Sequence, residues 1–197
     1  MNFSYHFPAV KGIQAGREYY ISMVPLKLLS RLFPAEEEIV LPEYRAQRRI
    51  NEARIPEIKN YILDNRDTYV FSALSASIDG EFKFTPYMDT DAGIFEVDMG
   101  SIFLINDGQH RKAAIEAAMK EDPSLEKETI SIVFFSDEGL ARSQQMFTDL
   151  NKHAVKTSNS LATLYDSRDE ICSRYKACYR CYSFFQKVYR QGKRYPW

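Results

Sequence analysis

Apolar positions along the first third of the chain change their spacing, which predicts strands alternating with helices. Residues 17–33, REYYISMVPLKLLSRLF, predict a strand that runs into Pro25 and a short helix after it. Pro56 divides residues 43–67, EYRAQRRINEARIPEIKNYILDNRD, and the apolar residues around and after the break follow helical spacing. A helix is therefore expected after Pro56.

The middle of the chain has the alternating pattern of strands. Residues 69–88, YVFSALSASIDGEFKFTPYM, alternate around Asp79-Gly80, which predicts a β-hairpin with a primed turn. Residues 93–105, GIFEVDMGSIFLI, predict one or two further strands, and residues 129–135, TISIVFF, predict a buried strand.

The order of these elements predicts a mixed α/β (α+β) fold, with a small mixed sheet flanked by helices. Residues 101–135 form a strand–turn–helix–strand unit, and such a crossover usually joins parallel strands with the helix on one face. Two more helices are expected, over residues 137–154 and 159–166.

The turn DGQHR, at the junction of the predicted strand and helix, carries the most distinctive chemistry. Asp107 is a good N-cap, and Gly108 relaxes the tight turn before a helix expected over residues 109–120. His110 and Arg111 then lie in the first helical turn, where the helix dipole disfavours positive charge. A bound anion reverses this cost, because it gains backbone N–H groups, the dipole and a guanidinium together.

This pattern predicts a pocket for a phosphate or a carboxylate, formed by Asp107, Gly108, Gln109, His110 and Arg111. The alternative is an ordinary turn in which Arg111 pairs with a nearby acid and His110 is half-buried. The residues themselves leave both interpretations open.

Charge is distributed unevenly along the 197 residues. The net charge of −1 argues against a protein that coats nucleic acid. Residues 168–197, however, hold eight Lys and Arg against two acids, while the first 167 residues hold 18 basic and 25 acidic residues. The basic segment is either a nucleic-acid arm or a solvated tail.

The chain is expected to consist of one domain, residues 1–167, and a basic tail rich in Cys and Tyr, residues 168–197. The three cysteines lie in the tail, and an odd number with no matching Cys/His pair predicts neither a disulfide framework nor a metal site. The apolar runs are too short to span a membrane, and the start of the chain lacks a signal-peptide pattern. A cytoplasmic location is the default expectation.

The DGQHR motif and its surroundings resemble the DGQHR-domain family over roughly residues 40–170. The similar segments are QRRINEARIPEIKNYIL, YVFSALSASIDGEF and QQMFTDLNKHAVKTSNSLATLYDSRD. Within the family the chain is most similar to the DndB-type regulators of bacterial DNA phosphorothioation, a sulfur modification. The resemblance implies a ParB/sulfiredoxin-like domain, in which a Gly-x-x-Arg turn at a helix start contacts nucleotide phosphate.

The same resemblance implies a DNA-binding transcriptional repressor that binds double-stranded DNA in the promoter region of its modification genes; a homo-oligomer is a further expectation. DndB-type proteins are expected to continue into another helical part. Residues 168–197 are therefore interpreted as a truncated or frameshifted end.

Four arginines near Pro56 are the candidates for contacts with DNA phosphates: Arg45, Arg48, Arg49 and Arg54. The alternative is that they pair along helices with neighbouring acids: Glu43, Glu52 and Glu57. A steep loss of DNA affinity with salt distinguishes the two.

A second hypothesis is an enzyme that binds or hydrolyses a nucleotide, by analogy with the ParB-like fold. Arg111 would hold phosphate, His110 would assist proton transfer, and Asp107 would orient the loop or a metal. The chain has neither a Walker A pattern nor a G-x-G-x-x-G pattern, and fold analogy is weak support for activity. An enzyme is the less favoured hypothesis, and a nucleotide is the one cofactor considered.

A third hypothesis is a metal-dependent nuclease. Asp79, Glu81 and Lys83 resemble the Glu-x-Lys strands of such enzymes. The predicted hairpin explains Asp79-Gly80 more simply, so the nuclease is the least favoured of the three.

Overall fold

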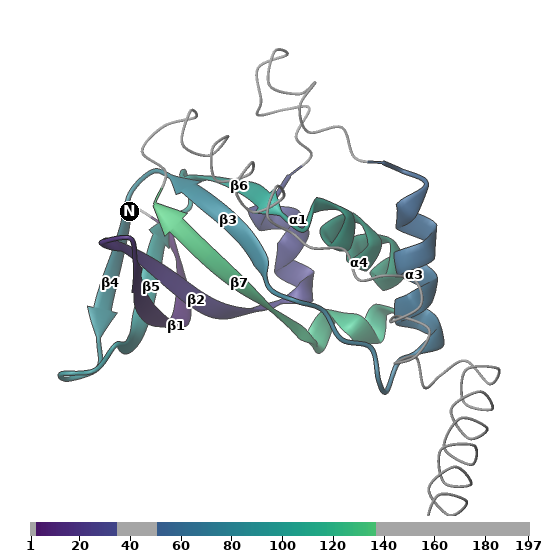
Figure 1. Cartoon of the computed structure of the whole chain (residues 1–197), viewed down its shortest axis with the longest axis horizontal. Helices are drawn as coiled ribbons and strands as arrows, with labels where there is room; N and C mark the ends of the chain where they lie inside the picture. The colour runs from purple at the N-terminus through teal and green to yellow at the C-terminus, as the bar shows by residue number, and fades with distance from the viewer. Residues whose placement is uncertain (1–2, 35–50, 137–197) are drawn as a thin grey trace, which may run out of the picture. The chain divides into compact units, whose positions relative to one another are not determined.

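A computed structural model describes residues 3–34 and 51–136, whose seven strands form one mixed sheet (Figure 1). The strands are β1 (Ser4–Gln14), β2 (Arg17–Pro25), β3 (Leu74–Asp79), β4 (Phe82–Pro86), β5 (Ala92–Asp98), β6 (Ile102–Asp107) and β7 (Thr129–Ser136). The α-helices are α1 (Leu29–Leu32), α3 (Arg54–Asp64) and α4 (Gln109–Glu121), and the 3₁₀ helices are η1 (Leu26–Leu28) and η4 (Pro123–Lys127). The predicted α/β class is confirmed; the ParB-like topology stays a prediction.

Several elements lie where the sequence predicts them. The strand into Pro25 and the short helix after it are β2, η1 and α1. Helix α3 begins two residues before Pro56 instead of after it, because the first-turn N–H groups of a helix have no intrahelical partner and proline is tolerated there. The predicted helices over 137–154 and 159–166, the boundary at residue 167 and the three cysteines lie outside the described residues.

Strand β1 has no counterpart in the prediction. Pro8 and Gly12 interrupt its pattern, yet it pairs with β2 on one side and β5 on the other. The turn into β2 uses Ala15 and Gly16, with φ values of 50° and 74°. Two left-handed residues in succession form the primed turn that suits a hairpin.

The hairpin predicted at Asp79-Gly80 is wrong. The strand order is β4-β5-β1-β2-β7-β3-β6, so β3 and β4 pair with different neighbours although two residues separate them. The chain bends at Gly80 and Glu81 but does not fold back on itself there. Strand β3 pairs with β6, and β4 pairs with β5. The sheet must therefore curl until its two ends approach each other. The reversal of direction lies later, between β4 and β5.

The prediction that α4 joins two parallel strands is also wrong. Strand β3 lies between β6 and β7, antiparallel to β6 and parallel to β7. Strands β6 and β7 are thus antiparallel and not adjacent, although α4 connects them. The β3–β7 pair is the one parallel pair among the described strands.

Aromatic side chains fill the interior of the curled sheet. Tyr20 stacks on Phe95 with ring centroids 4.4 Å apart, and Phe95 contacts Phe134 at 5.7 Å. Phe134 in turn contacts Phe7 and Phe103, which come from two further strands. No helix in the described part of the chain is long and apolar enough to cross a membrane.

Candidate anion-binding site

The DGQHR turn joins β6 to α4 and depends on its glycine. Gly108 has φ +104°, a left-handed conformation that L side chains rarely adopt. A Cβ atom at this position would lie 2.3 Å from Cδ2 of Leu74, the first residue of β3. Gly108 is the N-cap of α4 and Asp107 is the last residue of β6, so the predicted Asp107 N-cap is wrong.

Arg111 connects the turn to another segment of the same chain, the residues just before β3. Its Nη2 donates to Oδ2 of Asp107 at 2.5 Å, and its Nη1 donates to the carbonyl of Ser72 at 2.9 Å and to the Ser72 hydroxyl. The side chain is 15% exposed. The guanidinium thus ties the end of β6 to the segment before β3, and an anion at this turn would have to share it with Asp107. Anion binding by Arg111 stays a prediction.

His110 is half-buried and links α4 to the start of α3. Its Nε2 accepts a hydrogen bond from the backbone N–H of Asn51 at 3.0 Å. The proton of the neutral ring therefore sits on Nδ1, which can donate to a ligand. Burial lowers the pKa of His110 below its usual 6.5, and the nearby charge of Arg54 lowers it further, while Asp107 acts in the opposite direction. The imidazole is accordingly neutral at pH 7.

Helices α3 and α4 lie side by side and run in the same direction (Figure 1). Asn51, just before α3, contacts His110 in the first turn of α4. Farther along, Lys59 Nζ lies 2.5 Å from Glu121 Oε1 at the end of α4. The two N-termini therefore meet at one end, and the positive ends of the two dipoles reinforce each other there.

The charges at the two ends of this helix pair differ. At the C-terminal end, Arg66 is balanced by acids: its Nε lies 2.8 Å from Asp122 Oδ2 and its Nη1 lies 2.8 Å from Glu128 Oε1. At the N-terminal end, Arg54 is exposed and forms no ion pair with any described residue. The first turn of α4 contains no acid. Glu57 lies in the first turn of α3, so this end is distinguished by the exposed guanidinium of Arg54, which no described acid engages, and not by a net positive charge.

The structure brings most of the predicted site residues together. Asp107, Gly108, Gln109, His110 and Arg111 occupy one turn, and Arg54 lies close enough to His110 to affect its pKa. The other three candidates lie outside the described residues: Arg45, Arg48 and Arg49. Gln109 Nε2 donates to the carbonyl of Ile105 at 3.3 Å.

Two partners were missed from the sequence, Ser72 and Asn51. They lie 39 and 59 residues before the side chains that they contact, and no local pattern marks them. Of the nuclease residues, Asp79 ends β3 and Lys83 lies on β4, on either side of the bend. Within residues 3–34 and 51–136, no group of three His, Cys, Asp or Glu side chains is placed to hold a metal ion.

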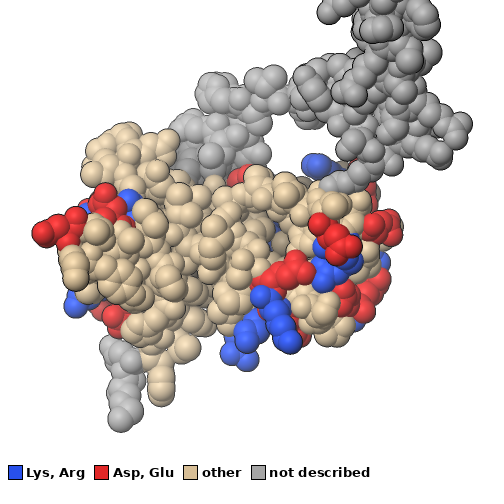
Figure 2. All heavy atoms as spheres, turned by 90° about the horizontal axis from the view of Figure 1, so that it is seen from below, with Lys and Arg blue, Asp and Glu red and all other residues tan. Residues whose placement is uncertain are grey.

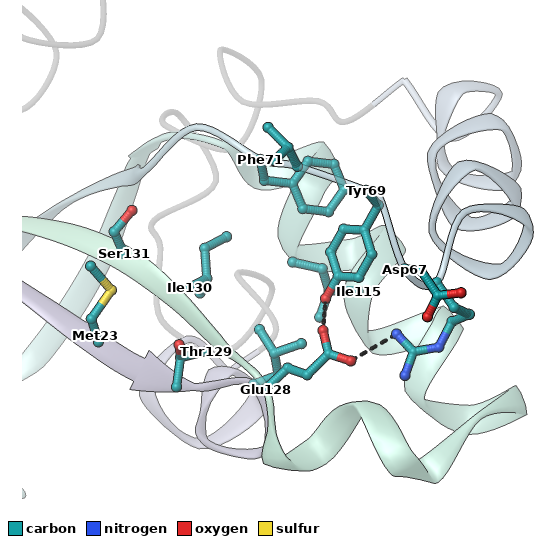
Figure 3. Close-up of a pocket in the computed structure, with 12 residues that line it drawn as sticks. Met23, Asp67, Tyr69, Phe71, Ile115, Glu128, Thr129, Ile130 and Ser131 are labelled. Atoms are coloured by element: carbon teal, nitrogen blue, oxygen red, sulfur yellow. Dashed lines mark hydrogen bonds and ion pairs between the residues drawn. The ribbon is translucent and has the colours of Figure 1, made fainter. Parts of the chain in front are cut away.

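A groove of about 370 Å³ lies near the C-terminal end of the helix pair (Figure 3). Tyr69 and Phe71 form one wall, Met23, Thr129 and Ser131 line the opposite side, and Ile115 and Ile130 lie between them. The Tyr69 hydroxyl donates to Glu128. Burial and this hydrogen bond raise the pKa of Tyr69 to about 12. Tyr69 and Arg66 thus both engage Glu128 in the groove, whereas Arg54 at the other end of the helices forms no ion pair with a described residue.

Comparison with known proteins identifies a family. The model of a family described as "DndB: DNA-sulfur modification-associated" matches residues 7–194. Neither the curated proteins nor the solved structures contain a match. The matched range includes the DGQHR turn, the helix pair and most of the basic tail.

Proposed function

The chain belongs to the DndB family of proteins associated with DNA sulfur modification, and from this premise we propose that it is a DNA-binding repressor of its modification genes. The proposal places DNA phosphate at the joined N-termini of α3 and α4. The observation that carries it is the exposed guanidinium of Arg54, which no described acid engages, beside the half-buried His110.

Three donors at this end suit a phosphate. Arg54 offers a guanidinium that no described acid engages. His110 offers Nδ1–H, because Asn51 occupies its Nε2. The first turn of α4 adds backbone N–H groups, and the two parallel helices add aligned dipoles. The N–H groups of Arg54 and Ile55 in α3 already donate to the carbonyls of Asn51 and Glu52. Cations at this position cost stability in the unbound protein, and a bound phosphate removes that cost.

The test is a fluorescence-anisotropy titration of the full chain, at several salt concentrations, with duplex DNA from upstream of the modification genes and with a scrambled duplex. Arg54→Gln should weaken binding about 3- to 10-fold and reduce the salt slope by about 1, since one phosphate contact is lost. The matched control is Lys120→Gln, which changes an exposed cation at the other end of α4 and should leave binding unchanged.

Two results would count against the proposal. If neither duplex binds, or if both bind equally, the chain is not a sequence-specific repressor. If the promoter duplex binds selectively but Arg54→Gln leaves the salt slope unchanged, DNA meets a different surface.

A nucleotide is the second candidate ligand, because its terminal phosphate is the same chemical group and would meet the same donors. ATP or CTP at millimolar concentration would then raise the melting temperature of the wild type, and the rise would be smaller in Arg54→Gln. Absence of a shift with either nucleotide would exclude this ligand for the chain. Competition between nucleotide and DNA would show that both occupy the same site.

A further inference from the structure

The groove of Figure 3 opens where two segments of the chain diverge. Strands β3 and β7 begin to pair at Leu74 and Ile132. The residues before these positions, 69–71 on one side and 128–131 on the other, line the groove instead of pairing with each other. Buried Ile115 of α4 forms part of the floor. The divergence of the two segments therefore creates a hollow with an apolar floor.

The size and lining of the groove suit a small molecule. Its volume is about 370 Å³, and small-molecule sites commonly measure roughly 300–1,000 Å³. Seven of its twelve lining residues are apolar or aromatic. Val70 is 77% exposed and Met23 is 60% exposed, so apolar side chains also stand at the mouth. A ligand with an apolar body can therefore bury its surface against the walls as well as the floor.

The charged residues of the groove leave it with a net negative charge. They are Arg66, Asp67 and Glu128. The guanidinium of Arg66 is already engaged, because it lies 2.8 Å from a carboxylate oxygen of Asp122 and 2.8 Å from one of Glu128. Glu128 also accepts a hydrogen bond from Tyr69. Asp67 is exposed and has no ion pair or hydrogen bond within the described part of the chain.

The other nearby cations do not occupy Asp67. Lys59 pairs with Glu121, with 2.5 Å between its Nζ and Oε1. Lys27 and Lys127 are exposed and do not line the groove. Figure 2 shows acidic and basic side chains interspersed at the right, on the side of the molecule where Figure 1 draws α3. The carboxylate of Asp67 is therefore the charged group of the groove with which a ligand can pair, and the ligand charge that fits it is positive.

The aromatic wall favours the same charge. The rings of Tyr69 and Phe71 lie 5.7 Å apart, and the ring of Phe71 lies 5.9 Å from that of Tyr61. The face of an aromatic ring is electrically negative and attracts a cation that lies within about 6 Å of the ring centroid. A carboxylate beside an aromatic wall thus suits an organic cation and repels an anion. The groove therefore differs in ligand class from the N-terminal end of the helix pair.

We propose that the groove binds a small organic cation. Its apolar body lies between the wall formed by Tyr69 and Phe71 and the opposite side formed by Met23, and its ammonium group pairs with Asp67. The inference does not depend on the proposed repressor function, because a groove of this charge is not a place for DNA phosphate.

An NMR titration of the full chain at pH 7 with two probes of similar shape tests the proposal. Tryptamine and indole-3-propionate share an indole ring and a two-carbon linker, but one ends in an ammonium group and the other in a carboxylate. Tryptamine should bind with a dissociation constant of about 1 mM, as expected for a ligand of about twelve non-hydrogen atoms. Indole-3-propionate should bind at least about 10-fold more weakly, because its charge is repelled.

Variants of Asp67 locate the charge that distinguishes the two probes. Asp67→Asn should weaken tryptamine binding about 5- to 10-fold, and Asp67→Lys should reverse the preference, so that indole-3-propionate binds more tightly. The matched control is Asp64→Asn, which changes an exposed acid at the end of α3 that does not line the groove. It should leave the affinity for tryptamine unchanged.

Several results overturn the proposal. They are equal binding of the two probes, no binding of tryptamine at about 10 mM, wild-type affinity in Asp67→Asn, and an equal loss of affinity in Asp64→Asn. A short peptide of leucine and lysine is titrated alongside. If it binds and tryptamine does not, the occupant is a basic protein segment and the small-molecule proposal is wrong. Because the measurement uses no DNA, its failure is separate from failure of DNA binding.

Discussion

Substitution of Arg111 by alanine should destabilise the fold, because the guanidinium connects two segments of the chain. It donates to Asp107 at the end of β6 and to Ser72 before β3. A hydrogen bond to a charged group contributes about 1.5–3 kcal/mol when it is buried. Asp107 is 44% exposed and Ser72 is exposed, so each contact is discounted to about 0.5–1.5 kcal/mol. The expected loss is about 1–3 kcal/mol in the free energy of unfolding.

Urea denaturation followed by circular dichroism measures this loss, with Lys120→Ala as a control expected to lie within about 0.5 kcal/mol of the wild type. Arg111→Lys should recover little, since a lysine cannot bridge both partners in the way the guanidinium fork does. If Arg111 instead belongs to the anion pocket predicted from the sequence, Arg111→Ala should weaken anion or DNA binding with little loss of fold. If the alanine variant keeps wild-type stability and loses DNA binding, Arg111 is a ligand contact and the structural argument is refuted.

Three further predictions concern single residues. Gly108→Ala should lower the free energy of unfolding by about 2–5 kcal/mol, because φ is +104° and the new Cβ would lie 2.3 Å from Leu74. Gly16→Ala, with open space around it, should lower it by about 1 kcal/mol in the same denaturation assay. An ultraviolet titration should show Tyr69 ionising near pH 12, and Tyr69→Phe should remove that component. Since this pKa is raised, the stability from Tyr69 is full below about pH 10 and is lost as pH rises toward 12. NMR should show His110 titrating with a pKa below 6.5. Since this pKa is lowered, the contribution of His110 to the free energy of unfolding is present above pH 6.5 and is lost as pH falls. A bound oligonucleotide should raise the pKa of His110. A His110 pKa that DNA does not change would argue against phosphate at this turn.

Local patterns predicted most of the individual elements. Helix α4 begins at Gln109 and β7 at Thr129, as expected, because a 3.6-residue or two-residue period depends on neighbouring side chains alone. The DGQHR turn was recognised for the same reason. Five consecutive residues contain the glycine that the backbone requires and the charged side chains that make the turn unusual.

Pairing between distant segments could not be predicted in this way. Asp79-Gly80 has the composition of a tight turn, yet the chain bends there and continues, because β3 pairs with β6 and β4 with β5. The energy of that choice lies in ladders and core contacts formed by residues far apart in the sequence, which a local pattern does not contain.

The same division applies to the site. The sequence by itself determined that a positively charged turn stands at a helix start and that an anion or a nearby acid must balance it. Only the tertiary structure decided that Asp107 and Ser72 engage Arg111, and that α3 runs parallel to α4 and brings Arg54 beside His110. The physical reason is that the direction of a charged side chain depends on which partners the fold places within hydrogen-bond reach.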